Sequence, residues 1–243
     1  MLSRVQINLF KWVRSFSYFL VSFSSLIIFS LFFKIRIEGK DNLPANEKVI
    51  IAANHQNFFD GFFLSYILGS NKKVSFVIAK RSVKNKIVYG ILRLIGSVFV
   101  GRGTEEYHKA IKKLRKTLLQ GGSIGIFPEG DVSSFSTPRS FKGGVAKLSI
   151  DTNTKVVPVY LQGTYHLRFL NYWLKRPEIL ISVGKPVELF KIAKFYGSDP
   201  EKHEKVASLI RDKIIELSGL EQKAEDITIV NKAISKEEIA LNA

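Results

Sequence analysis

Residues 49–60 read VIIAANHQNFFD, and the pattern of this stretch recurs along the chain. Its first five residues, Val49–Ala53, are all apolar, as expected for a strand that is buried on both faces of a sheet. A polar run of Asn, His, Gln and Asn then leads into an aromatic segment that begins at Phe58. The stretch therefore predicts a strand, a turn and a helix, with polar side chains gathered at the turn.

Short β-like and longer helix-like segments alternate on both sides of this stretch, which indicates an α/β fold. We expect a mixed sheet of about seven strands flanked by helices. The expected strands are Lys34–Glu38, Val49–Ala53, Val74–Ala79, Ser97–Val100, Ser123–Phe127, Val156–Leu161 and Ile179–Val183. The expected helices are Phe58–Leu68, Val83–Ile95, Glu105–Leu119, Gly143–Asp151 and Glu201–Ser218.

We find no internal repeat and no linker that would separate two soluble domains. Residues 1–33 are expected to form an N-terminal membrane-anchoring helical segment, and residues 34–220 a single α/β domain. Residues 221–243 show weak periodicity, so we expect a loosely held C-terminal tail.

The composition excludes several classes of protein and site. Of the 243 residues, 46% are hydrophobic and 12% aromatic, which suits a chain with a real core rather than a disordered one. The chain has no Cys, which excludes disulfides, a thiolate nucleophile and Cys-based metal sites. The four histidines are scattered, at His55, His108, His166 and His203.

The charge calls for an anionic partner, because 37 Lys and Arg against 21 Asp and Glu leave a formal charge of +16. Residues 61–104 contain no acid at all. They carry eight cations, Lys72, Lys73, Lys80, Arg81, Lys84, Lys86, Arg93 and Arg102. Nucleic acid, phospholipid headgroups and phosphorylated substrates all fit such a surface, as does an ordinary solvated basic face.

The N-terminal segment favours lipid over nucleic acid. Residues 15–33 carry no charge, and as a helix they would reach roughly 28 Å, close to a bilayer core of about 30 Å. Upstream, Val5, Leu9, Trp12 and Phe16 recur at helical spacing, as in a helix that lies at a membrane interface. Several serines dilute the apolar run, namely Ser17, Ser22, Ser24, Ser25 and Ser30.

Both flanks of this run are basic, at Arg14 and Lys34, so a single span would place one positive flank outside. We therefore expect a monotopic helical hairpin at the cytoplasmic face of a membrane, bound to its anionic surface and not to nucleic acid. A cleaved signal peptide is the alternative, but no small-residue cleavage site follows the run.

His55 and Asp60 are the first candidate for chemistry. On one ideal helix, residues five apart point about 140° away from each other. If His55 lies in the turn and Asp60 lies inside the helix, their side chains can meet. The carboxylate would then orient the imidazole, as in general-base catalysis. A helix cap beside a hydrogen-bonded histidine is the simpler interpretation.

In two further stretches, an expected strand is followed by a charged residue next to glycine. Phe127-Pro128-Glu129-Gly130 would leave the Glu129 carboxylate free to accept substrate hydroxyls, although an ordinary turn fits the same residues. Val98–Gly103 leads to Arg102 between two glycines, where a guanidinium could bind a phosphate or simply lie in solvent.

In this order, these elements resemble the glycerolipid acyltransferase family, which includes bacterial lysophosphatidic acid acyltransferases. The family has four motifs: Asn-His-x4-Asp, an apolar strand ending in Arg, Phe-Pro-Glu-Gly-Thr-Arg-Ser, and a strand with Val-Pro-Val. The matching residues are Asn54, His55 and Asp60; Val98 to Arg102; Phe127, Pro128, Glu129, Gly130 and Ser133, followed by Phe141, Lys142 and Gly144; and Val157, Pro158 and Val159, extended to Gln162, Gly163 and Thr164. The resemblance covers about Ile35 to Ser218.

The resemblance implies transfer of an acyl chain from acyl-CoA or acyl-carrier-protein to the free hydroxyl of lysophosphatidic acid, which makes phosphatidic acid for phospholipid synthesis. It implies His55 as the base that removes the hydroxyl proton and Asp60 as the residue that orients it. Acceptor-binding residues would be Glu129, Gly130, Arg102 and Lys142. It implies no cofactor and no metal, because the donor arrives already activated.

One position departs from the family pattern. Where the third motif has Thr-Arg, this chain has Asp131 and Val132, which removes a cation that would help to hold a phosphate. Alternatives therefore remain: another acceptor such as an aminolipid or a non-phosphorylated lysolipid, hydrolysis of acyl thioesters, or a non-catalytic basic membrane-binding protein.

Overall fold

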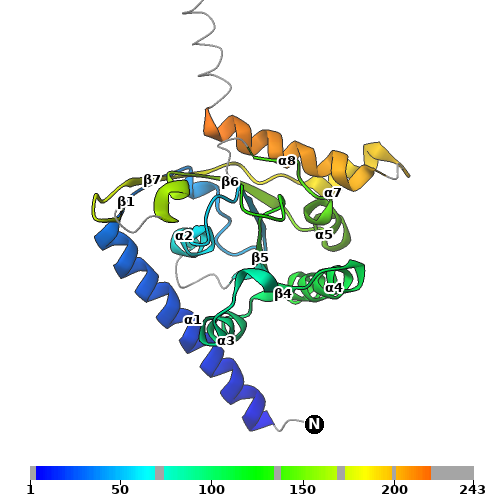
Figure 1. Cartoon of the computed structure of the whole chain (residues 1–243). Helices are drawn as coiled ribbons and strands as arrows, with labels where there is room; N and C mark the ends of the chain where they lie inside the picture. The colour runs from blue at the N-terminus through cyan, green and yellow to red at the C-terminus, as the bar shows by residue number, and fades with distance from the viewer. Residues whose placement is uncertain (1–3, 69–73, 134–137, 169–172, 199–200, 220–243) are drawn as a thin grey trace, which may run out of the picture.

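In the computed structural model, seven strands form one mixed sheet in the order β1-β7-β6-β2-β5-β3-β4 (Figure 1). The structure describes residues 4–68, 74–133, 138–168, 173–198 and 201–219, so the expected tail at 221–243 lies outside the described residues. Neighbouring strands run parallel except β6 and β7, which are antiparallel. The expected mixed sheet flanked by helices is confirmed.

Each of the expected strands forms, and no end differs from its prediction by more than one residue. Their bounds are β1 Lys34–Glu38, β2 Ile50–Ala53, β3 Val74–Ala79, β4 Val98–Val100, β5 Ser123–Ile126, β6 Val156–Gln162 and β7 Glu178–Val183.

The expected helices also form, as α2 Asp60–Leu68, α3 Lys86–Leu94, α4 Thr104–Leu119, α5 Gly144–Thr152 and α8 Lys202–Ser218. Helix α3 begins three residues later than predicted because Asn85 caps it: its side-chain oxygen accepts the N–H groups of Ile87 and Val88 at 2.8 and 3.2 Å. The short helix α7, Leu189–Ile192, was not predicted, since four residues are too few to show a helical period.

The sheet is covered on both faces, which explains why the strand that opens the decisive stretch is apolar throughout. Ile50 and Ala52 belong to one core cluster, which also contains buried residues of α4, α5 and α8. Ile51 and Ala53 belong to the other, together with residues of α2 and the end of α1. Alternate residues of β2 therefore fill two different cores, and each fully buried large side chain contributes about 1.5–3 kcal/mol.

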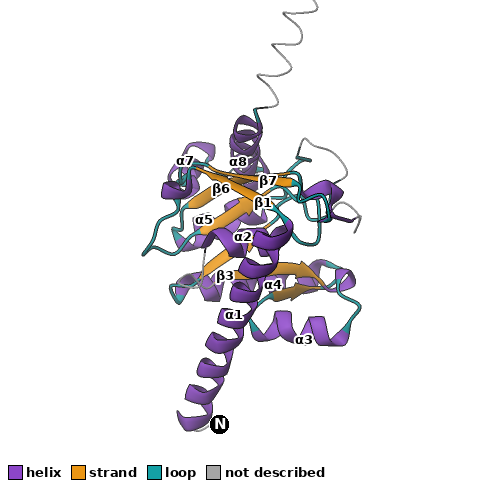
Figure 2. Cartoon of the chain, turned by 90° about the vertical axis from the view of Figure 1, so that its left-hand side faces the viewer, coloured by secondary structure: helices purple, strands orange, loops and turns teal. Residues whose placement is uncertain are grey.

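The N-terminal segment is one continuous helix, α1 Arg4–Phe32, so the expected hairpin is wrong. No Gly or Pro lies between these bounds to break the backbone, and the serines in the run stay helical. Figures 1 and 2 show α1 running from the β1 edge of the sheet past α3. Within the part of the chain that the structure describes, no helix has the length and apolarity needed to cross a membrane.

The last turn of α1 is part of the core. Phe29 stacks on Phe63 of α2 with ring centroids 4.4 Å apart, and Phe33 lies edge-on to the same ring at 5.6 Å. Farther toward the N-terminus, buried Tyr18 packs in a small cluster with Leu92 and Ile95 around α3. The helix is thus attached to the domain over at least four turns.

The parallel strands β2, β5, β3 and β4 are consecutive neighbours in the sheet, so their carboxyl ends meet at one edge. Loops at this edge of an α/β sheet are where ligands commonly bind. The polar stretches that follow β2, β4 and β5 all leave the sheet here.

Candidate active site

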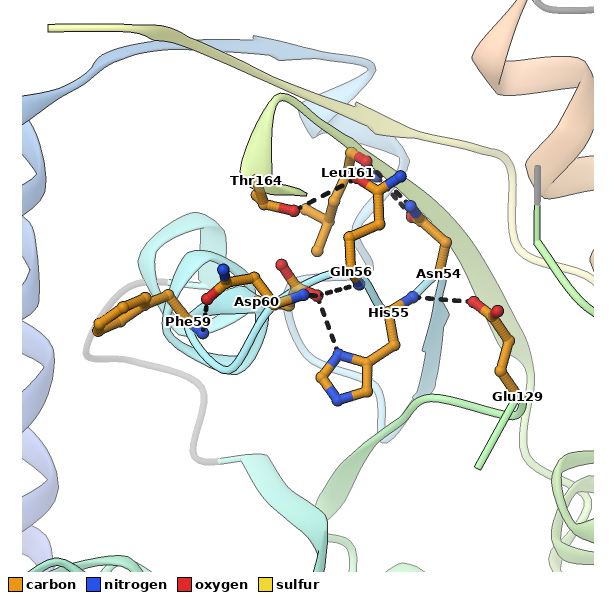
Figure 3. A network of polar contacts seen from close by, with 9 residues as sticks. Asn54, His55, Gln56, Phe59, Asp60, Glu129, Leu161 and Thr164 are labelled. Carbon is orange, nitrogen blue, oxygen red and sulfur yellow. Dashed lines mark hydrogen bonds and ion pairs between the residues drawn. The ribbon is translucent and has the colours of Figure 1, made fainter. Parts of the chain in front are cut away.

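The loop after β2 folds around one buried carboxylate. Asp60 is the first residue of α2, and its Oδ2 accepts the backbone N–H groups of Gln56 and Asn57 at 2.7 and 2.8 Å. The same oxygen lies 2.9 Å from Nδ1 of His55. Figure 3 shows the second ring nitrogen of His55 pointing away from Asp60. The geometry expected from the sequence, with His55 in the turn and Asp60 in the helix, is the one observed.

The exposure of the pair suits a base and its orienting group. The His55 side chain is 20% exposed and lines a cavity, whereas the Asp60 side chain is fully buried. A buried carboxylate on one ring nitrogen fixes the ring orientation and favours the imidazolium that forms after proton abstraction. The other nitrogen then remains available to a substrate in the cavity.

Phe127, the residue after β5, sets the plane of the imidazole. Its ring stacks on that of His55 with centroids 4.1 Å apart and planes inclined by 15°. Sequence reasoning assigned Phe127 no role beyond its place in a motif. The contact joins positions 72 residues apart, so no local pattern could have revealed it.

Asn54 ties the same loop to the neighbouring strand β6. Its side-chain amide donates to the carbonyl of Leu161 at 2.9 Å, and its side-chain oxygen accepts the N–H of Leu161 at 2.7 Å. This pair of hydrogen bonds continues the β2–β6 ladder through a side chain, just where β2 ends. The two hydrogen bonds therefore hold the chain in a fixed position immediately before His55.

The expectation that the Glu129 carboxylate is free for substrate hydroxyls is wrong. Glu129 is buried, its Oε1 accepts the backbone N–H of His55 at 2.9 Å, and its Oε2 accepts that of Arg139 at 3.0 Å. Burial raises the pKa of Glu129 above its ordinary value, although both backbone hydrogen bonds oppose that rise. Glu129 thus connects the loop after β2 with two parts of its own loop between β5 and α5, and its carboxylate is occupied by the backbone of the protein itself.

Gly130 and Lys142 lie against each other beside this carboxylate. Gly130 has φ +81°, and a Cβ at this position would lie 2.6 Å from Nζ of Lys142. A side chain here would be strained and would displace the lysine. Both residues line the cavity, so the structure brings them together with His55.

The cavity has a volume of about 880 Å³, and its buried and exposed lining residues differ in chemistry. Its interior lies between α2, β3, α3 and α4 and is lined by apolar side chains such as Phe62, Phe76, Leu92, Ile95 and Leu114. Its mouth, as we call the part with exposed charged lining residues, contains four cations, Lys80, Arg81, Arg102 and Lys142, and His55 lines the same cavity. Such a space suits a molecule with a long apolar part and an anionic head.

Arg102 lines the mouth, and its role in phosphate binding stays a prediction. Lys80 and Arg81 were singled out only as members of a basic stretch. They directly follow β3, which the sheet order places beside β5. Lys80 pairs with Glu106, and Arg81 pairs with Asp131. Within the described ranges, no group of three or more acidic or His side chains is arranged to hold a metal ion.

Comparisons with known proteins agree with this arrangement. A family model described as Acyltransferase matches residues 34–162. A 1-acyl-sn-glycerol-3-phosphate acyltransferase of Borreliella burgdorferi is 31% identical over 186 residues, which are 75% of this chain and 70% of that protein. The chloroplastic 1-acyl-sn-glycerol-3-phosphate acyltransferase LPAT1 of Arabidopsis thaliana is 30% identical over 153 residues, 62% of this chain and 42% of the plant protein.

A solved structure is similar over most of the chain. The crystal structure of the 1-acyl-sn-glycerophosphate acyltransferase PlsC from Thermotoga maritima matches with a TM-score of 0.64 at 25% identity. The match covers 89% of this chain and 84% of that structure. The likeness therefore extends beyond the residues of the family model.

Proposed function

The chain belongs to the Acyltransferase family and is an O-acyltransferase, and we propose that it moves a fatty acyl chain to the free hydroxyl of lysophosphatidic acid, making phosphatidic acid for phospholipid synthesis. The observation that carries the proposal is the His55–Asp60 pair at the point where an apolar cavity opens into a cationic mouth. The similar proteins that are named for this activity support the choice of acceptor. The family assignment rules out the alternative of a non-catalytic membrane-binding protein.

In the proposed reaction, the free ring nitrogen of His55 removes the proton of the acceptor hydroxyl. The oxygen attacks the thioester carbonyl of the donor, so that a carbon–oxygen bond forms and the carbon–sulfur bond breaks. The imidazolium then returns the proton to the departing thiolate. Asp60 keeps the ring oriented and stabilises its charged form, and general-base assistance of this kind contributes about 10²–10⁴-fold.

The other site residues divide into two groups in this proposal. Arg102 and Lys142 line the mouth and would contact the acceptor phosphate, and Gly130 leaves room for the side chain of Lys142. Glu129 would act on the acceptor indirectly, because its hydrogen bond to the His55 backbone positions the base. The donor would be acyl-CoA or acyl-carrier-protein, which share the thioester that this mechanism needs.

We also propose that the enzyme works at the cytoplasmic face of a bacterial inner membrane, on an anionic lipid surface. Exposed apolar side chains along α1 support this, namely Trp12, Phe16, Phe19, Leu20, Phe23, Ile27, Ile28 and Leu31. Helix α3, which contacts α1, adds exposed Ile87 and Ile91 beside exposed Lys84, Lys86 and Arg93. Apolar and basic side chains that lie together in this way suit binding within one leaflet.

A second acceptor class remains a candidate because Val132 is exposed at the mouth where the family pattern has Arg. An aminolipid or a non-phosphorylated lysolipid would not need that cation. The two candidates differ in what loss of a mouth cation should do. It should weaken binding of a phosphorylated acceptor and hardly change binding of one with a neutral headgroup.

One assay tests the proposal. Purified protein in detergent is given labelled acyl-CoA or acyl-carrier-protein together with a panel of lysolipids, and His55→Ala is run in parallel. Selective esterification of lysophosphatidic acid, lost in the variant, would support it. Preference for an uncharged lysolipid would favour the second candidate, and release of free fatty acid without ester formation would mean thioester hydrolysis.

A further inference from the structure

The four cations at the cavity mouth are not equivalent. Arg102 and Lys142 have no carboxylate partner among the residues that the structure describes. Lys80 and Arg81 are both held in ion pairs, with Glu106 and Asp131 respectively. A phosphate that enters the mouth would meet two cations that are available and two that already have a counter-ion.

The Arg81–Asp131 pair joins positions 50 residues apart, and the sheet explains how they meet. Arg81 follows β3 and Asp131 follows β5, and these strands are parallel neighbours in register from Val74 and Ser123 onward. Both side chains leave the sheet at its carboxyl edge and line the cavity. Asp131 is the residue that stands at the first of the two positions where this chain departs from the family motif.

The pair is exposed enough to exchange partners. The side chains of Arg81 and Asp131 are 49% and 53% exposed, and ion pairs in contact with solvent contribute little to stability. A phosphomonoester dianion carries more charge than a carboxylate and can accept two parallel hydrogen bonds from one guanidinium. Separating Arg81 from Asp131 therefore costs little free energy. The contact of Arg81 with a phosphate is stronger than the contact with Asp131 that it replaces.

From these observations we propose that Arg81 binds the phosphomonoester of the acceptor, and that Asp131 is its resident counter-ion, which the phosphate displaces. Arg81 then supplies, from the loop after β3, the positive charge that Val132 cannot supply from the loop after β5. An acceptor without a phosphate gains nothing from Arg81 and leaves the Arg81–Asp131 pair intact, so Arg81 favours phosphorylated acceptors. This inference rests on the proposed function, because it names how the same site recognises its acceptor.

The test uses the full-length protein with four variants: Arg81→Ala, Asp131→Asn, the double variant, and Arg115→Ala as a matched control. Arg115 has the same 49% side-chain exposure and an ion pair, with Asp151, but it lies on α4 and outside the cavity lining. Michaelis constants are measured for lysophosphatidic acid, for monoacylglycerol and for acyl-CoA. Circular dichroism and melting temperature verify that each variant is folded.

We expect Arg81→Ala to raise the Michaelis constant for lysophosphatidic acid by about tenfold or more, as for a lost charge-assisted contact, and to leave that for monoacylglycerol unchanged. Asp131→Asn should lower the constant for lysophosphatidic acid by up to about fivefold, because the phosphate no longer competes with a weak ion pair. In the Arg81→Ala background, Asp131→Asn should lose most of this effect. Arg115→Ala should behave as the unmodified protein.

Three results would overturn the proposal: an unchanged constant for lysophosphatidic acid in Arg81→Ala, additive effects in the double variant, or a change confined to acyl-CoA. The last result would assign Arg81 to the 3′-phosphate of the donor. A second measurement, free of turnover, follows protection against thermal unfolding by inorganic phosphate, with sodium chloride at equal ionic strength as the reference. If the protein acylates no lysolipid, the proposed function fails. Thermal protection by phosphate that is lost in Arg81→Ala would still support an anion site at Arg81. If phosphate gives the unmodified protein no such protection, the anion site is refuted.

Discussion

The buried carboxylate of Glu129 accepts the backbone N–H of His55 at 2.9 Å, so the loop after β5 holds the candidate base that follows β2. In the other direction, the carbonyl of His55 accepts the N–H of Ser133 at 2.6 Å. His55 is thereby fixed through its backbone by one loop and through its ring by Asp60. This arrangement makes Glu129 a positioning residue, and its loss should affect both stability and turnover.

Glu129→Gln should lower the free energy of unfolding by about 1–3 kcal/mol, because one of the two backbone donors would face an amide N–H₂ instead of an oxygen. It should also lower kcat more than it raises the Michaelis constants, since the base moves while the mouth cations stay. Urea unfolding and steady-state kinetics measure both effects. Glu105→Gln, at an 82% exposed position on α4, is the control, and an equal loss there would contradict a specific role for Glu129.

The raised pKa of Glu129 predicts a pH dependence of stability. Burial places its folded-state pKa above that of the unfolded chain, so the folded state binds more protons between the two values. The free energy of unfolding should therefore fall as the pH rises from the unfolded pKa, about 4.3, through the higher folded value, and then level off. Urea unfolding across this range measures the free energy of unfolding of the unmodified protein and of Glu129→Gln. The excess in the unmodified protein should decline as the pH rises. A difference that grows with pH would mean that the hydrogen bonds outweigh burial.

His55→Ala should lower turnover by about a hundredfold or more and leave the fold intact, because His55 lies in a loop at the cavity and not in the core. Esterification with purified protein and a melting curve measure the two parts. His108→Ala, an exposed histidine on α4, is the matched control and should retain full activity. Near-normal turnover by folded His55→Ala would refute the mechanism.

Replacing Phe16, Phe19 and Phe23 of α1 with Ser should weaken binding to vesicles that contain anionic lipid, because these exposed rings are the apolar part of the proposed contact. The binding that remains should depend on salt, since basic residues supply it. Deletion of the whole segment would be a poor test, because Phe29 and Phe33 belong to the core. Phe195→Ser, at a 90% exposed position outside α1, is the control. Salt-resistant binding that all three substitutions leave unchanged would place the membrane contact elsewhere.

Arg102→Ala should raise the Michaelis constant for lysophosphatidic acid by roughly 10- to 150-fold, the range for a charge-assisted contact of about 1.5–3 kcal/mol. The constant for acyl-CoA should hardly change. Val132→Arg should improve the use of lysophosphatidic acid only if the mouth lacks a cation for its phosphate. An equal loss of all acceptors and of the donor in Arg102→Ala would make Arg102 structural.

The sequence determined the local features of this protein. Strands such as β3, Val74–Ala79, were predicted from apolar runs bounded by turns. The helices were predicted from apolar residues that recur at helical spacing, and both patterns are local in the sequence. The His55–Asp60 contact was also predictable, since five residues and one strand-to-helix turn suffice to close it. The continuous course of α1 could also have been predicted, because no Gly or Pro interrupts residues 4–32, but the basic flanks were given more weight and favoured a hairpin.

The tertiary structure alone decided which loops meet. Insertion of β5 between β2 and β3 brings Glu129 to the backbone of His55 and Asp131 to Arg81, across 74 and 50 residues of chain. The role of Glu129 was misjudged for this reason: a carboxylate after a strand looks free until the neighbouring loop buries it. Strand order depends on the packing of two whole faces of the sheet, which no short stretch encodes. The order of the strands therefore determines which charges face the cavity.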